Sequence, residues 1–228
     1  STQAASHPAA IPATASVTKK ATLALGIGLA GCVLSALGLF FGNPTAAAAA
    51  WFVALMFWLS IAVGMLFLIL LHHLFDAGWS TVLRRQLEHG VSAIKWLALL
   101  FLPLLLASWF YHRGILWHWM DPHFIRPNGE MVGQDVAYLK KDAYLNIDFF
   151  TIRAILYFAI WVVFAEVLRW ASFKQDDDGD GKWTQVCRNT AAAGIALVGL
   201  AVTFAAFDWV LSLEYHWFST MYGVWFFA

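Results

Sequence analysis

Five segments of the chain are apolar for about 20 residues each, the length of helix that crosses the hydrocarbon core of a bilayer. Hydrophobic residues make up 61% of the sequence and charged residues only 12%, against about 25% in soluble domains. We therefore predict an all-α fold, a polytopic membrane helix bundle with five complete transmembrane helices. The predicted spans are roughly residues 22–41, 50–71, 91–111, 150–170 and 190–212.

A sixth apolar run begins near Trp217 and reaches only about half the length of a span by Ala228. We interpret it as the start of a sixth helix and expect this chain to be the N-terminal part of a longer protein. A re-entrant or interfacial terminal helix is the alternative.

The segments around the spans complete the predicted organisation. The first residues are rich in Ala, Ser, Thr and Pro and lack apolar periodicity, which is typical of a flexible tail. The expected parts are a flexible cytoplasmic N-terminal tail (1–20), the first transmembrane helix and turn (21–49), a four-helix membrane bundle (50–212), and an outer turn with the start of the next helix (213–228). Within the bundle we expect loops at 72–90, at 112–149 on the outer side, and at 171–189, the last acidic and cytoplasmic.

The orientation follows from the distribution of Lys and Arg, which are more frequent in cytoplasmic loops. More of them fall on the side of the N-terminus than on the other side, so we expect a multi-pass membrane protein with a cytoplasmic N-terminus. On the N-terminal side lie Lys19, Lys20, Arg84, Arg85, Lys95, Arg169, Lys174, Lys182 and Arg188; on the other lie Arg113, Arg126, Lys140, Lys141 and Arg153.

Charge and cysteine usage exclude several classes of function. The net charge is zero and no basic run occurs, which argues against nucleic acid as a partner. Cys32 and Cys187 form no CxxC or CxxCH motif, so the chain alone cannot hold an iron–sulfur cluster or a c-type haem. The histidines gather at the two predicted surfaces and not in a mid-membrane pair, which argues against a b-type haem. They are His72, His73 and His89 on one side and His112, His118, His123 and His216 on the other.

The segment "DDDGDGKW" resembles the opening of a calcium-binding loop. Asp176, Asp178 and Asp180 lie at alternate positions, where carboxylates can converge on one hard cation. The position that should supply a bidentate Glu is Cys187. The three aspartates are therefore a metal-site candidate, with a solvated acidic loop as the alternative.

Polar residues inside the fourth span are candidates for a proton path, because charges within a membrane are costly and are usually functional. Arg153 and Tyr157 lie one helical turn apart and could line the outer half of such a path. Glu166 lies near the cytoplasmic end, where it could take part in proton uptake. A local ion pair with Arg169, three residues later, is the alternative for Glu166.

The end of the fifth span carries a second set of proton-path candidates. If the helix continues, Asp208, Ser212 and His216 follow one another at four-residue steps and form a polar stripe near the outer interface. A carboxylate, a hydroxyl and an imidazole can exchange protons, and His titrates in the physiological range. The alternative is an aromatic belt at the headgroup level. Its members would be Trp209, Tyr215, Trp217 and Tyr222.

Three long stretches point to a family. "HHLFDAGWSTVLRRQLEH" (72–89), "KKDAYLNIDFFTIRAILYF" (140–158) and "DWVLSLEYHWFSTMYG" (208–223) resemble the second quinone-binding membrane subunit of bacterial alternative complex III. That subunit is similar to the polysulfide-reductase NrfD-type membrane proteins. The resemblance implies a ten-helix protein of two four-helix bundles with flanking helices. It also implies a complex of the bacterial inner membrane that oxidises menaquinol or ubiquinol and passes electrons to cytochrome c or another acceptor.

The resemblance further implies how the work is divided. The partners would be membrane lipid, a sister NrfD-type subunit, a multihaem cytochrome c and iron–sulfur subunits, which would carry the haems and clusters. This chain would bind no redox cofactor of its own and would not be catalytic alone; it would contribute a proton path or a quinone contact. His112 and Trp209 are candidates for the quinone contact. A purely structural anchor is the alternative, and a secondary transporter is a weaker one, because Pro103 is the only proline inside the spans.

Overall fold

The computed structural model describes residues 15–78, 81–111 and 113–227. The structure is 81% helical, and no strand occurs in these ranges, where Ile125 and Met131 form an isolated bridge. This confirms the predicted all-α class. The chain divides between Ala47 and Ala48 into two units, which we describe separately.

The first unit contains helix α1 (Ala15–Phe41) and the beginning of α2 (Pro44–Phe75). The apolar side chains of α1, such as Leu25 and Leu34, are largely exposed, as in a helix that lipid surrounds. The side-chain oxygen of Asn43 accepts a hydrogen bond from the Ala46 backbone N–H (3.1 Å), which caps α2. Pro44 occupies the first helical position, where its missing N–H costs nothing.

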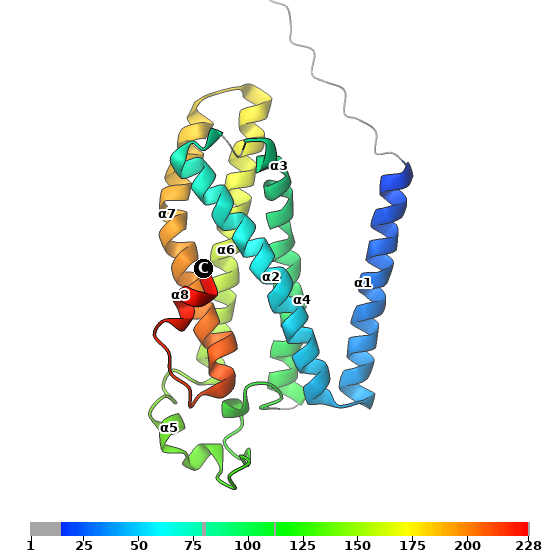
Figure 1. The fold of residues 1–228 in the computed structure, drawn as a ribbon, viewed down its shortest axis with the longest axis vertical. Helices are drawn as coiled ribbons and strands as arrows, with labels where there is room; N and C mark the ends of the chain where they lie inside the picture. Colours follow the sequence, from blue (N-terminus) through cyan, green and yellow to red (C-terminus); the bar gives the residue numbers. More distant parts are fainter. Residues whose placement is uncertain (1–14, 79–80, 112, 228) are drawn as a thin grey trace, which may run out of the picture. The chain divides into compact units, whose positions relative to one another are not determined.

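The second unit is a bundle of long helices that run side by side (Figure 1). Two of its rods combine several helical segments. The first joins α3 (Thr81–Gly90), the 3-10 turn η2 (Val91–Ala93), α4 (Ile94–Leu106) and the π-helix η3 (Ala107–Tyr111); the second joins α7 (Lys182–Ala205), the π-helix η6 (Ala206–Val210) and the 3-10 turn η7 (Leu211–Glu214). Helix α2 and helix α6 (Ile147–Asp178) are the other two rods, and the short α8 (Tyr222–Phe227) follows.

The core of the bundle contains large aromatic residues, and the outer surface of its helices is apolar as well. Trp117, Trp161 and Trp209 are almost fully buried, whereas Ile155 on α6 and Leu200 on α7 are more than half exposed. Exposing such a large apolar surface is unfavourable in water but not in the hydrocarbon core of a membrane. Across the described residues, five helices are long and apolar enough to cross a membrane. The chain is therefore a multi-pass membrane protein.

The two ends of the bundle differ in their connections. At one end, which we call the loop end, residues 113–146 join η3 to α6 and contain η4 (His118–Met120), η5 (Val132–Gln134) and α5 (Val136–Leu139). At the other, the turn end, only Gly179–Gly181 joins α6 to α7. Figure 1 shows the loop end with α5 opposite the turn between α6 and α7. Asp208 lies at the loop end and Asp176 at the turn end.

Two predicted loops are wrong in extent, because they are mostly helical. In the segment 72–90, α2 continues to Phe75 and α3 begins at Thr81; in the segment 171–189, α6 continues to Asp178 and α7 begins at Lys182. Charged residues show where a helix leaves the hydrocarbon. The helix itself can continue into water, where these side chains pair with one another. Helix α6 ends at Gly179, which takes the left-handed conformation (φ 67°) that favours glycine at a helix C-terminus.

The predicted outer segment 112–149 folds back onto the bundle. Trp117 and Trp119 come from this segment and are fully buried. The indole N–H of Trp117 donates a hydrogen bond to the backbone carbonyl of Trp209 (3.0 Å). The segment is therefore a packed cap. The apolar run predicted to begin near Trp217 becomes helical only from Tyr222.

Candidate functional site

A buried ion pair joins α6 to the π-helix η6 at the loop end. The guanidinium of Arg153 donates two hydrogen bonds to Asp208, from Nε to Oδ2 (2.6 Å) and from Nη2 to Oδ1 (3.0 Å). The side chain of Arg153 is 8% exposed and that of Asp208 is not exposed at all. Across residues 15–78, 81–111 and 113–227, this is the only ion pair in which both side chains are less than a tenth exposed.

Further groups complete the environment of this pair. The hydroxyl of Tyr157 donates a hydrogen bond to Asp208 Oδ2 (2.6 Å), and Arg153 Nη1 donates to the backbone carbonyl of Tyr144 (3.1 Å). The Arg153 guanidinium also lies 3.9 Å from the ring centroid of Tyr144 and 4.2 Å from that of Phe149. Burial and the nearby Asp208 carboxylate raise the pKa of Tyr144. A buried charge is tolerated only when it is paired in this way.

The local backbone explains why Asp208 faces α6. Asp208 lies in the π-helix Ala206–Val210, which interrupts the α-helical register at the end of α7. Such segments shift the side chains that follow them and are frequent at functional sites. Trp209, the next residue, packs its ring against Phe101 (4.7 Å between centroids) and Phe158 (5.3 Å). The π-helix therefore places a carboxylate and an indole inside the bundle.

The predicted stripe of Asp208, Ser212 and His216 does not form. The Ser212 hydroxyl donates to the backbone carbonyl of Asp208 and not to its carboxylate. The helix ends at Glu214, and the His216 ring contacts Asp135 instead, with Nε2 2.5 Å from Oδ2. The four-residue spacing assumed an α-helix, but a π-helix and a 3-10 turn occupy this segment. The aromatic belt is also wrong in part, because Trp209 and Tyr215 are buried while Trp217 is half exposed.

His216 belongs to a second polar cluster, centred on Asp135 at the start of α5. Asp135 Oδ2 accepts hydrogen bonds from Arg126 Nη1 (2.8 Å) and the Tyr215 hydroxyl (2.8 Å), and its Oδ1 accepts from the Ala137 backbone N–H (2.8 Å). Burial raises the pKa of Asp135, but the hydrogen bonds from Tyr215, Ala137 and His216 outweigh it and hold this pKa below its ordinary value. Burial, followed by the Asp135 contact, raises the pKa of Tyr215.

A third cluster lies at the turn end and surrounds Glu88 of α3. Glu88 is fully buried, and its Oε2 accepts a hydrogen bond from Arg85 Nη1 (2.6 Å) while Arg84 Nε lies 3.5 Å from Oε1. Both arginines also reach Asp176 near the end of α6. The two arginine side chains are 24% and 30% exposed. This cluster therefore fastens α3 to α6 at the rim of the bundle.

The remaining proton-path candidate, Glu166, is 42% exposed on its side chain. It accepts hydrogen bonds from Arg169 Nη1 (3.0 Å) and from Lys95 Nζ on α4 (3.2 Å). Glu166 thus forms the local ion pair with Arg169, extended by a lysine from a neighbouring helix. The structure does not bring Glu166 to the Arg153–Asp208 pair.

The three aspartates of the acidic segment do not converge. Asp176 contacts Arg85, Asp178 accepts a hydrogen bond from the Trp183 indole (2.8 Å), and Asp180 pairs with Lys182 (2.9 Å). A search of the described ranges finds no group of three His, Cys, Asp or Glu residues able to hold a metal. Each carboxylate is turned toward a different basic or indole group, so the calcium site stays a prediction.

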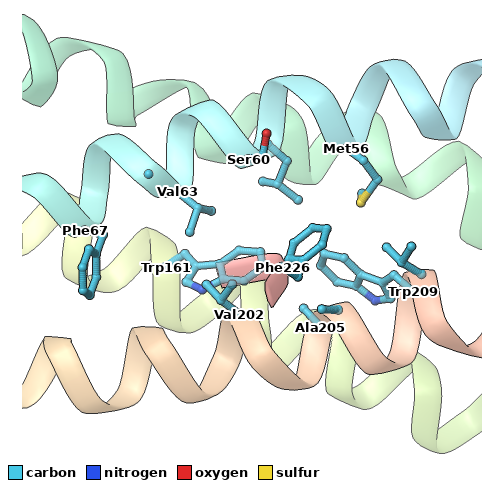
Figure 2. Close-up of a pocket in the computed structure, with 13 residues that line it drawn as sticks. Met56, Ser60, Val63, Phe67, Trp161, Val202, Ala205, Trp209 and Phe226 are labelled. Carbon is cyan, nitrogen blue, oxygen red and sulfur yellow. The ribbon is translucent and has the colours of Figure 1, made fainter. Parts of the chain in front are cut away.

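Of the two quinone-contact candidates, His112 lies outside the described residues. Trp209 lines a cavity of about 100 Å³ between α2, α6 and α7. Figure 2 shows Ser60 and Val63 of α2, Trp161 of α6 and Phe226 of α8 around the same space. The indole N–H groups of Trp161 and Trp209 are buried and have no hydrogen-bond partner in the part of the chain that the structure describes. The cavity is smaller than the ~150 Å³ void that takes up a benzene molecule.

Sequence reasoning missed three of these functional groups. Asp135 carries a recognisable signal, because an Asp before an apolar run is typical of a helix N-cap. Glu88 carries another, because it follows Arg84 and Arg85 at helical pairing distances. Tyr144 carries none, since its role comes from contact with Arg153.

The fold and these clusters define the class: a multi-pass membrane protein with a buried, cross-helix ion pair at one end. The sequence matches no known family model and no curated protein.

Proposed function

We propose that this chain is an integral membrane subunit of a respiratory quinol:electron-acceptor oxidoreductase of the alternative complex III type. It would lie in the bacterial inner membrane with a cytoplasmic N-terminus, so that the loop end faces outward. The observation that supports a role in proton handling is the buried cluster of Arg153, Asp208 and Tyr157. Oxidation of a quinol releases protons, and a subunit beside that reaction can take them up.

In this proposal, the hydrogen bonds of Asp208 control when its carboxylate takes up a proton. Two charge-assisted hydrogen bonds from Arg153 occupy both carboxylate oxygens of Asp208. A proton reaches Asp208 only when Arg153 gives up at least one of these hydrogen bonds. The arginine can then keep its hydrogen bond to the Tyr144 carbonyl. The Tyr157 hydroxyl lies on Oδ2 and can exchange its proton with an incoming one. The pair thus acts as a gate.

A second candidate function is a purely structural anchor for partner subunits. The observation that favours it is the completeness of the pair: both oxygens of Asp208 and all three guanidinium nitrogens of Arg153 have partners. Such a contact also fastens α6 to the end of α7. The two functions differ in what a change at Tyr157 does, because Tyr157 contributes a hydroxyl without contributing to the ion pair.

The deciding experiment uses the full-length subunit in its assembled complex. In Tyr157→Phe the ring and the ion pair remain, and we expect normal recovery of haem and iron–sulfur partners with quinol oxidation about tenfold slower or more. Tyr222→Phe is the matched control, because no hydrogen bond of the Tyr222 hydroxyl occurs within the described ranges. An unchanged turnover in Tyr157→Phe would reject the gate and leave the anchor, and absence of such partners would reject the complex itself.

A further inference from the structure

A pocket of about 520 Å³ opens at the loop end. Three segments line it: residues 140–145 before α6, the end of the α7 rod, and residues 215–220. Figure 1 shows these segments meeting beside the C-terminal end of that rod. Trp217, a residue type that favours the headgroup level of a membrane, lies on its rim and is 52% exposed. The pocket therefore lies where lipid headgroups are found.

The charge of the lining is one-sided. Lys140 and Lys141 line the pocket, and none of the described Asp or Glu residues does. The Lys141 ammonium donates a hydrogen bond to the Tyr215 backbone carbonyl (2.6 Å), a contact that fixes its position without neutralising its charge. Lys140 is exposed and makes no ion pair in the described part of the chain. Two uncompensated positive charges thus face one space.

The rest of the lining is divided between hydroxyls and apolar rings. Ser212, Ser219 and Thr220 also line the pocket and carry hydroxyl groups. Phe204 and Phe207 form an apolar wall, and Phe204 is 44% exposed on the surface of α7 that hydrocarbon would cover. Long cationic side chains place their charge at the membrane interface. The lysines above an apolar wall therefore match a lipid with an anionic headgroup above apolar acyl chains.

We propose that this pocket binds the headgroup phosphate of an anionic phospholipid. Lys140 and Lys141 contact the phosphate, the hydroxyls of Ser219 and Thr220 accept or donate hydrogen bonds to the headgroup, and the acyl chains lie along Phe204 and Phe207. The lipid fills the space between the capping segment and the α7 rod, so it seals the loop end against the membrane. This binding is independent of quinol oxidation.

The test uses the full-length protein, stripped of lipid in detergent and then titrated with phosphatidylglycerol or phosphatidylcholine. Bound lipid is counted by native mass spectrometry, and the thermal unfolding midpoint is followed in parallel. We expect the phosphatidylglycerol affinity to exceed the phosphatidylcholine affinity, and to fall about fivefold in Lys140→Gln. Lys174→Gln is the matched control, since Lys174 is an exposed lysine at the opposite end of α6.

The outcomes separate the sources of phosphate. Phosphatidylglycerol binding that inorganic phosphate does not displace supports the lipid site, whereas displacement by millimolar phosphate overturns it. Equal affinity for both lipids, or a preference that survives in Lys140→Gln, also overturns it. A double variant would also replace Lys141, but Lys141 donates a hydrogen bond to the Tyr215 carbonyl and its loss can disturb folding. If the double variant does not fold, Lys140→Gln alone decides the result.

Discussion

At the loop end, Asp208 pairs with an arginine 55 residues away along the chain, on another helix. At the turn end, Glu88 pairs with Arg84 and Arg85, four and three residues before it on its own helix. Both carboxylates are fully buried, but the arginines at the turn end keep about a quarter of their surface exposed, and Arg153 does not. Burial of the acid is therefore the same at both ends, and we expect the exposure of the remaining arginine to decide how much stability is lost when the acid is replaced.

The largest expected effect is at the loop end. In Asp208→Asn the Arg153 charge stays buried without a counter-charge, and we expect a loss of about 3–5 kcal/mol in the free energy of unfolding. Chemical denaturation of the detergent-solubilised protein measures it. A loss below 1 kcal/mol would show that water reaches Arg153, which would remove the distinction between the two ends.

The cluster around Asp135 should give the next effect, and its pH dependence is specific. Because the folded-state pKa of Asp135 is lower than its ordinary value of 3.8, its stabilisation is present at neutral pH and is lost as the pH falls through the folded pKa. Asp135→Asn should cost about 2 kcal/mol at pH 7. The difference from the unmodified protein should shrink between pH 5 and pH 2.

Asp142→Asn is the matched control for that experiment, since Asp142 is exposed in the same segment. A stability difference for Asp135→Asn that stays constant down to pH 2 would contradict the assignment.

The turn end should tolerate its substitution better. Glu88→Gln keeps the shape of the side chain, and both arginines retain Asp176 and access to water. We expect a loss of about 1 kcal/mol, measured under the same conditions as Asp208→Asn. A loss as large as that at Asp208 would mean that the local arginines are as confined as Arg153.

Glu166 should give the smallest effect. Its ion pairs with Lys95 and Arg169 lie on an exposed surface, so Glu166→Gln should change the free energy of unfolding by less than about 0.5 kcal/mol. High salt should reduce this change in the free energy of unfolding further, because salt screens exposed ion pairs. A loss above 1 kcal/mol would contradict this expectation, and a defect in proton transfer in the assembled complex would support the prediction that Glu166 belongs to the proton path.

The sequence predicts the bundle and its class because a bilayer demands long apolar helices, and α2, α6 and α7 are recognisable from length alone. It also marks Arg153 and Asp208 as costly charges. It does not pair them, since a contact between residues 55 positions apart depends on helix packing. The π-helix at Ala206–Val210 breaks the four-residue period on which the predicted stripe rested.

The capping segment illustrates the same limit of periodicity. Trp117 and Asp135 lie in a stretch without a regular apolar pattern, so the sequence presents them as loop residues. Their burial follows from contacts with Trp209 and Tyr215, at the far end of the chain. Short-range patterns therefore locate the membrane spans, and long-range contacts build the candidate site.

The most direct measurement is a pair of double-mutant cycles on the free energy of unfolding. One combines Arg153→Gln with Asp208→Asn, and the other combines Arg85→Gln with Glu88→Gln. We predict a coupling of about 2–3 kcal/mol for the cross-helix pair and below about 1 kcal/mol for the pair within α3. Equal couplings at the two ends would contradict the claim that the Arg153–Asp208 pair is more confined than the pair within α3.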